Sequence, residues 1–191
     1  MSVKKPLPRG ISTFKKIIED GYLYIDKTQI IHHFITTEQY CFLARPRRFG
    51  KSLLVSTLKE IFQGNKELFA DLWIGKKSNY TWKKHPVIHL DLSAIDSSTP
   101  EKLEIGLCEA LHEAGRDFHI DISSIEQSGA RLIRLVKELS TQGRVVILID
   151  EYDAPITSTL YDIDLANNNR RALRSFYTVI KSLDQYIKFF F

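Results

Sequence analysis

The segment Arg45-Pro-Arg-Arg-Phe-Gly-Lys-Ser52 indicates the fold class through the elements predicted on either side of it. The apolar run from Tyr40 to Ala44 before it predicts a short buried strand. The residues from Ser52 to Phe62 after it carry apolar side chains at helical spacing and predict an amphipathic helix. A strand, a basic turn with a glycine and a helix in this order direct the amides of the helix N-terminus toward an anion.

The residue types in this turn suit the phosphates of a nucleotide. A glycine lets the backbone approach the phosphates closely, Lys51 would reach the β- and γ-phosphates, and the Ser52 hydroxyl would hold Mg²⁺. The pattern G-x-x-x-x-G-K-[ST] is incomplete, since Arg45 stands at its first glycine. An ordinary helix start with basic residues nearby is the alternative interpretation. The predicted nucleotide contacts are Arg47, Arg48, Phe49, Gly50, Lys51, Ser52 and Leu53.

A second motif, Val145-Val-Ile-Leu-Ile-Asp-Glu-Tyr-Asp153, follows an aliphatic strand with carboxylates. An aspartate at the end of a buried strand is costly unless a cation or hydrogen bonds satisfy it. Beside a phosphate loop, Asp150 would complete the Mg²⁺ shell, and Glu151 would polarise a water for attack on the γ-phosphate. Taken alone, a solvated strand end is the competing interpretation. We therefore predict Lys51 and Glu151 as catalytic residues, and Ser52 and Asp150 as metal ligands.

The rest of the chain alternates short apolar runs with helical patterns. Further strands are predicted at Val87 to Leu92, at Val145 to Ile149 and in the last five residues. Helices are predicted after start signals at Ser98 to Glu101 and at Ser124 to Gln127, and again from Leu173 to Leu183. Such alternation is typical of an α/β fold with a parallel sheet covered on both faces, which binds ligands at the carboxyl ends of its strands.

Composition places the chain among ordinary globular proteins. Of its 191 residues, 43% are hydrophobic and 26% are charged, which argues against disorder. Neither a secretory signal nor a membrane span is expected, and Cys41 and Cys108 are expected to be free thiols in a reducing cytoplasm. Residues 1–60 carry eleven Lys and Arg against five Asp and Glu. This bias indicates a nucleic-acid face or a phosphate site.

Three motifs together resemble a known family. Tyr24-Ile-Asp-Lys-Thr28, the turn from Arg45 to Ser52, and Asp150-Glu-Tyr-Asp-Ala-Pro-Ile156 are similar to segments of the predicted AAA-ATPase-like domain of bacterial and archaeal proteins. The resemblance implies an ATP-binding P-loop NTPase core, a three-layer sandwich of the AAA/ASCE-like type with a mostly parallel sheet. It also implies an additional strand between the lysine strand and the acidic strand. The site residues carried over are Gly50, Lys51, Ser52, Asp150 and Glu151.

The same resemblance bears on domain organisation. We expect residues 1–38 to form an N-terminal segment packed on a P-loop ATPase core at 39–191, and this core to be truncated within its fourth strand. Longer relatives continue into a sensor strand, a helical region and often a nuclease-like domain, so a nucleic-acid partner would act through such a C-terminal region. The motif Asp26, Lys27 and Thr28 is recurrent without an implied role. A nucleotide contact and a structural role at a helix start both stay open for it.

Several arginines are weaker candidates. Arg47 and Arg48 are hypothesised to neutralise phosphate charge, and a solvated basic loop is the alternative. Arg170, Arg171 and Arg174 are candidates for an arginine presented to a neighbouring subunit, which would require oligomerisation. The stretch that contains them is also typical of a polar helix surface.

The sequence therefore predicts a domain that binds Mg-ATP and hydrolyses the β–γ phosphoanhydride. A nucleotide-dependent switch without turnover is one rival, because no sensor residue or assured arginine finger is visible. A nucleic-acid-binding module that uses the basic first third is the other. Its positive charge is concentrated in the phosphate turn itself, which favours the nucleotide interpretation.

Overall fold

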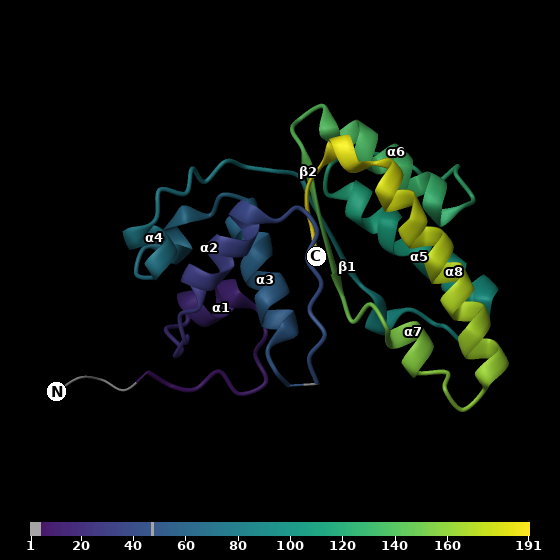
Figure 1. Ribbon diagram of the computed structural model, residues 1–191, viewed down its shortest axis with the longest axis horizontal. Helices are drawn as coiled ribbons and strands as arrows, with labels where there is room; N and C mark the ends of the chain where they lie inside the picture. Colours follow the sequence, from purple (N-terminus) through teal and green to yellow (C-terminus); the bar gives the residue numbers. More distant parts are fainter. Residues whose placement is uncertain (1–4, 47) are drawn as a thin grey trace.

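The computed structural model describes residues 5–46 and 48–191, so the predicted phosphate contact of Arg47 lies outside the described residues. Its strands form one parallel sheet in the order β1-β2-β3. The bounds are β1 Val87–Asp91, β2 Val145–Asp150 and β3 Ile187–Phe190, which confirms the strands predicted in these three regions. Because the strands are parallel, their carboxyl ends meet at one end of the sheet, the lower end in Figure 1.

The third strand lies between β2 and the chain that precedes the basic turn. The Cys41 amide donates to the Phe190 carbonyl at 2.9 Å, and the Phe190 amide donates to the Gln39 carbonyl at 2.8 Å. On the other side, β3 pairs with β2 through Val145, Val146 and Ile147. A strand thus separates the lysine-bearing segment from the acidic strand, in the position that the family resemblance implies.

The prediction of a buried strand from Tyr40 to Ala44 is wrong. Within the described residues, this segment makes a single parallel bridge, Tyr40 with Phe190, and is otherwise an irregular extended chain. Phe42 is 70% exposed, and Ala44 is exposed as well. The segment lies at the edge of the sheet beside β3, which is only four residues long. After Tyr40 the segment therefore has no described strand beside it with which to pair.

Helices cover both faces of the sheet, which gives three layers (Figure 1). Helices α1–α4 lie on one face, α5, α6 and α8 lie on the other, and α7 follows the carboxyl end of β2. The helix bounds are α1 Phe14–Glu19, α2 Thr28–Thr37, α3 Lys51–Phe62, α4 Trp73–Lys77, α5 Pro100–Arg116, α6 Ser128–Ser140, α7 Ala154–Thr157 and α8 Ile163–Ser182. The 3₁₀ helices are η1 Lys66–Phe69, η2 Leu92–Ala94 and η3 Asp184–Tyr186.

Each face of the sheet has its own hydrophobic core, because alternate residues of β2 point to opposite sides. Val146 and Leu148 pack with α1–α4, whereas Val145, Ile147 and Ile149 pack with α5, α6 and α8. All six residues of β2 are buried, as expected for the central strand of a covered parallel sheet. This burial explains why the sequence of β2 is a continuous aliphatic run and not an alternating one.

The two predicted start signals of helices have different outcomes. Helix α5 begins where expected, with Pro100 in its first turn and the Thr99 hydroxyl accepting from the Lys102 amide at 3.2 Å. The helix predicted after Ser124 to Gln127 is present as α6, which begins at Ser128, but no side chain of the start signal caps it: Gln127 is the N-cap residue and makes no side-chain cap hydrogen bond. The preceding loop is held instead by the Arg131 guanidinium, which donates to the carbonyls of Ser123, Ile125 and Cys108.

Across the described part of the chain, none of the helices combines the length and the apolar character needed to cross a bilayer.

Candidate functional site

The carboxyl end of the sheet brings together the two motifs that the sequence singled out. Lys51 is the first residue of α3, Asp150 is the last residue of β2, and Glu151 follows it directly. All three side chains line one cavity. Asp91, at the end of β1, stands opposite Asp150 in the ladder. Its carboxylate accepts from the Ser93 amide at 2.9 Å and starts η2, so it serves the turn after β1.

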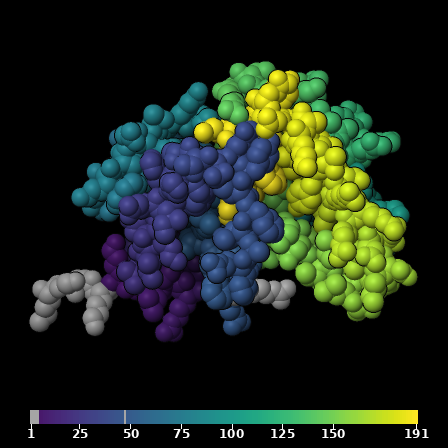
Figure 2. Space-filling model, in the orientation of Figure 1, coloured from purple at the N-terminus to yellow at the C-terminus, as the bar shows by residue number. Residues whose placement is uncertain are grey.

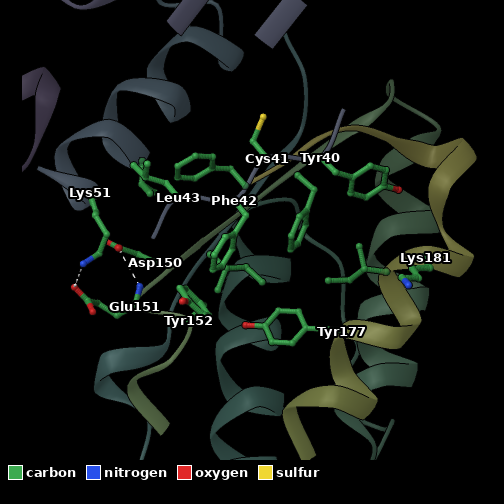
Figure 3. A pocket seen from close by; sticks show the side chains of 15 residues that line it. Tyr40, Cys41, Phe42, Leu43, Lys51, Asp150, Glu151, Tyr152, Tyr177 and Lys181 are labelled. Atoms are coloured by element: carbon green, nitrogen blue, oxygen red, sulfur yellow. Dashed lines mark hydrogen bonds and ion pairs between the residues drawn. The ribbon is translucent and has the colours of Figure 1, made fainter. Parts of the chain in front are cut away.

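The ammonium of Lys51 lies between two oxygens. Its Nζ atom donates to the Arg45 carbonyl at 3.1 Å and lies 3.9 Å from Oε1 of Glu151. Figure 3 shows these two side chains pointing toward one another beside Asp150. Both are only partly exposed, at 17% for the lysine side chain and 30% for the glutamate. The first residue of the degenerate motif, Arg45, thus contributes its backbone carbonyl to the position of the lysine.

The backbone around Glu151 is held in an uncommon conformation. Its φ of 47° lies in the left-handed region, which costs a residue with a Cβ about 1 kcal/mol. The amide of Glu151 donates to Oδ1 of Asp150 at 3.0 Å. Asp150 is 7% exposed, and this hydrogen bond satisfies part of a carboxylate that is otherwise taken out of water. Strained conformations of this kind cluster at functional sites.

The turn before α3 is open to solvent. Arg48 and Gly50 have φ angles of 69° and 78°, and the residues from Arg48 to Gly50 are exposed. The first backbone bond of the helix runs from the Leu54 amide to the Gly50 carbonyl, so the amides of the three preceding residues come before the helical ladder. The Leu53 side chain packs toward the core, which leaves only its amide for a nucleotide contact.

The described side chains do not form a complete metal site by themselves. Among residues 5–46 and 48–191, no group of three or more His, Cys, Asp or Glu side chains is placed to hold a metal ion. The predicted ligands Ser52 and Asp150 would supply two oxygens. Asp150 lines the cavity, whereas Ser52, the second residue of α3, is not among its lining residues. Two protein oxygens agree with the chemistry of Mg²⁺, which is usually held by one or two carboxylates together with phosphates and waters.

The cavity beside this site has a volume of ≈ 330 Å³ and an apolar, aromatic lining that the sequence did not predict. It extends from Lys51 and Glu151 along the exposed segment before the turn to α8 (Figure 3). Phe42 contacts Tyr152 edge to face, with ring centroids 4.9 Å apart. The Tyr177 hydroxyl is buried and has no hydrogen-bond partner among the described residues. No sequence pattern indicates this lining, because its residues come from five separate segments of the chain.

Asn169 was also missed. The stretch around Arg170, Arg171 and Arg174 has a sequence typical of a polar helix surface, but the Asn169 side chain next to it is fully buried. Its Nδ2 donates to the carbonyls of Ser97 at 2.9 Å and Pro155 at 3.0 Å, which ties α8 to the loop after β1 and to α7. Arg170, Arg171 and Arg174 are exposed on the same helix. A buried asparagine among arginines carries no distinguishing sequence pattern.

The Asp26-Lys27-Thr28 motif joins the starts of two helices. One oxygen of Asp26 accepts from the amide and the hydroxyl of Thr28, at 2.8 and 2.6 Å, and the other accepts from the Trp73 amide at 2.6 Å. The Thr28 hydroxyl in turn accepts from the Ile74 amide at 3.0 Å. Of the two roles left open, the structural role at a helix start has these contacts in its favour. Burial acts to raise the pKa of Asp26, but the hydrogen bonds outweigh it and lower the pKa below its usual value.

The chain is similar over almost its whole length to a curated bacterial protein. An uncharacterized protein in the vnfD 5′ region of Azotobacter chroococcum mcd 1 is 38% identical over 189 residues. The match covers 97% of this chain and 36% of that protein, so the chain spans about a third of the length of this relative. No solved structure matches the chain.

A family model accounts for almost the whole sequence. The model described as "Predicted AAA-ATPase" matches residues 8–191, from the segment before α1 to the residue after β3. The match includes the basic turn, the acidic strand and the Asp26-Lys27-Thr28 motif, the three segments on which the resemblance rested. By this match, the chain belongs to the predicted AAA-ATPase family.

Proposed function

We propose that this domain binds Mg-ATP and hydrolyses the bond between the β- and γ-phosphates. The observation that carries the proposal is the convergence of Lys51, Asp150 and Glu151 on one cavity at the carboxyl end of a parallel sheet. Ligands bind at this end of open α/β sheets. Membership of the predicted AAA-ATPase family supports nucleotide binding in general.

In this proposal the phosphates occupy the position toward which the Lys51 ammonium and the first amides of α3 are directed. The partial positive charge of the helix N-terminus and the lysine charge act together on the β- and γ-phosphates. Since a phosphate is a stronger partner than a half-exposed carboxylate, Lys51 would exchange its contact with Glu151 for one with the nucleotide. The binding of ATP would therefore release Glu151.

Ser52 and Asp150 are the residues that would hold the magnesium ion. Both offer hard oxygen donors, and Asp150 stands at the end of a fully buried strand where an unpaired carboxylate is costly. When bound, Mg²⁺ would neutralise charge on the phosphate oxygens.

Glu151 would then accept the proton of the attacking water. The water oxygen forms a bond to the γ-phosphorus, the bond from this phosphorus to the bridging oxygen breaks, and ADP and inorganic phosphate leave. A carboxylate placed directly after the metal-binding aspartate is suited to orient this water. The left-handed backbone at Glu151 would be the conformation that aims the side chain into the cavity.

The test compares wild type with Lys51→Ala and Glu151→Gln in ATP binding and in phosphate release. We expect Lys51→Ala to lose binding, and Glu151→Gln to bind ATP but to lose turnover by about a hundredfold or more. Lys66→Ala and Glu126→Gln remove exposed groups of the same types elsewhere and should behave as wild type. Equal turnover in the wild type and both site variants would overturn the proposal.

A nucleotide switch without turnover is the second candidate. It is favoured by the contact of Glu151 with Lys51, which occupies the carboxylate that hydrolysis requires. Wild type that binds ATP tightly, releases no phosphate and differs from Lys51→Ala only in binding would identify a switch.

A further inference from the structure

A second pocket opens at the end of the sheet opposite to the proposed nucleotide site. It has a volume of ≈ 560 Å³, and the residues around it come from α2, from the segment 79–85, from the start of β2 and from β3. In Figure 1 this segment passes above α2 to the start of β1, at the end of the sheet where all three strands begin. At the upper edge of Figure 2 its teal atoms adjoin the indigo atoms of α2 and yellow atoms of the last residues.

The charged residues of this pocket are all basic. Lys83, Arg144 and Lys188 line it together with His32 and His85, and no carboxylate is among the lining residues. Within the described part of the chain, none of the three cations forms an ion pair with an Asp or Glu. Like charges gathered without a counter-charge repel one another, so their convergence favours an anionic ligand.

An irregularity of the sheet accounts for the position of Lys188. Val145 pairs with Ile187, but the next residue of β2, Val146, pairs with Phe189. Lys188 is thus the extra residue of a β-bulge, and its neighbours Ile187 and Phe189 enter the cores on opposite faces of the sheet. A bulge redirects the side chain that it carries. Here it leaves a lysine at the pocket and out of both cores.

The electrostatic surroundings of His85 agree with a positive potential in the pocket. Its Nδ1 lies 2.9 Å from the Arg144 carbonyl. Burial lowers the pKa of the His85 ring, and the positive charges of three neighbouring side chains lower it further. The three side chains belong to Lys188, Lys83 and Arg144. Because these cations all act on one ring, their field converges on the pocket wall that His85 forms.

Aromatic rings and neutral donors adjoin the cations. The His32 ring contacts the Tyr80 ring edge to face at 6.1 Å, and Tyr80 contacts Trp82 at 5.3 Å. The exposed residues Asn79 and Thr81 supply an amide and a hydroxyl. The run Tyr80-Thr-Trp-Lys-Lys-His85 places two aromatic residues before two lysines and a histidine. Of the two rings, Tyr80 lines the pocket, whereas Trp82 packs against Phe69. Surfaces that bind single-stranded nucleic acids combine cations along the backbone with aromatic rings in this manner.

We propose that this basic pocket binds the phosphate backbone of a single nucleic-acid strand. Cations that converge from three separate segments, beside the ring of Tyr80, can contact successive phosphates and a base of one strand. The site is separate from the Lys51 turn, which lies at the carboxyl end of the sheet. The proposal does not rest on ATP hydrolysis.

The experiment measures fluorescence anisotropy of a labelled single-stranded DNA oligonucleotide over a range of salt concentrations. Lys83→Glu/Lys188→Glu is compared with Lys66→Glu/Lys137→Glu, which makes the same change in net charge at exposed lysines elsewhere. We expect the pocket variant to bind about tenfold more weakly or worse, and to reduce the slope of log K against log salt by about 2. The matched control should keep both values close to wild type.

Two further variants keep the test specific. Lys188→Ala, which leaves the bulge without a reversed charge, should reduce the slope by about 1 while the far-ultraviolet circular dichroism stays that of wild type. Lys51→Ala should bind the oligonucleotide as wild type does, which separates this site from the phosphate turn. Absence of oligonucleotide binding in the wild type, or an equal loss in the pocket variant and its matched control, would overturn the proposal.

Discussion

The Lys51 ammonium lies 3.9 Å from the Glu151 carboxylate and also contacts the Arg45 carbonyl. These two contacts aim the lysine at the carboxyl end of β2. Partly exposed ion pairs of this kind contribute only ~0.2–1 kcal/mol, so a phosphate can displace the carboxylate readily. Lys51 is thus held in position and can still exchange the Glu151 carboxylate for a phosphate.

Replacement of this carboxylate should strengthen ATP binding. In Glu151→Gln the lysine no longer has an ionic competitor, and the phosphates no longer meet a nearby negative charge. We expect the Kd for ATP to fall by about two- to fivefold in a calorimetric titration, which corresponds to the loss of one partly exposed ion pair. Glu126→Gln serves as the exposed control and should leave the Kd unchanged. Weaker binding by Glu151→Gln would contradict this account of the pair.

A methyl group on Gly50 should affect both stability and nucleotide binding. Gly50 has a φ of +78° and no heavy atom within 4 Å of an added Cβ, so the cost comes from the backbone alone. Gly50→Ala should lower the free energy of unfolding by about 1 kcal/mol and weaken ATP binding, because the turn relaxes from the left-handed conformation.

Gly10 offers a matched control for this substitution. Its φ is +72° and its surroundings are equally open. Gly10→Ala should cost a similar amount of stability in chemical denaturation and leave ATP affinity unaltered. An equal loss of affinity in both variants would show that the effect at Gly50 reflects stability and not phosphate contact.

Asp26 should make the stability dependent on pH in the acid range. The folded state lowers the pKa of this carboxyl, so it stabilises the fold at pH values above the unfolded pKa of about 3.9. That contribution is lost as the pH falls through the lower pKa of the folded state. Asp26→Asn, which leaves an amide donor where an acceptor is needed, should cost about 1–2 kcal/mol at neutral pH.

The check is the difference in unfolding free energy between wild type and Asp26→Asn, measured by urea denaturation from neutral to acid pH. We expect this difference to shrink as the pH falls. Asp20→Asn, at an exposed aspartate with no side-chain hydrogen bond within the described residues, should show little difference at any pH. A difference for Asp26→Asn that is constant with pH would refute the assigned role of the ionised carboxylate.

Asn169 should be far more sensitive than its neighbour in sequence. Asn169→Ala removes both side-chain donors and leaves the Ser97 carbonyl without that partner. We expect a loss of about 2 kcal/mol in the free energy of unfolding. Asn168→Ala, at an exposed position one residue earlier on α8, should cost less than about 0.5 kcal/mol. Similar costs for the two variants in thermal denaturation would mean that the buried amide does not hold the loops together.

Local patterns predicted the elements that depend on local sequence. The aliphatic run of β2 and the Thr99-Pro100 start of α5 act over neighbouring residues, and both are confirmed. The predicted start signal does not cap α6, because the side chain that binds the start of this helix comes from a distant residue. The Ser128 amide and hydroxyl both donate to the carboxylate of Glu104 on α5, which no pattern near Ser124 can indicate.

The same distinction between local and distant sequence holds for the residues of the candidate site. The sequence singled out Lys51, Asp150 and Glu151, and the fold brings these three side chains to one cavity. It gave no sign of the aromatic wall, which is assembled from distant segments. The excess of basic residues at 1–60 likewise does not indicate the basic pocket at the start of the sheet. The cations of the second pocket stand at positions 83, 144 and 188, and only the start of the sheet brings them together.

The insertion of β3 between β2 and the 39–41 segment has a consequence for biosynthesis. As the chain leaves the ribosome, the lysine-bearing segment and the acidic strand emerge well before residues 187–190, which must come between them. The segment before the phosphate turn therefore cannot pair with the sheet until β3, far downstream in the chain, has been synthesised. Contacts of such long sequence separation slow folding, because a large loop closes before they are gained. Until then the nascent chain exposes the edge of β2 that pairs with β3, and a chaperone that shields this edge would favour correct assembly.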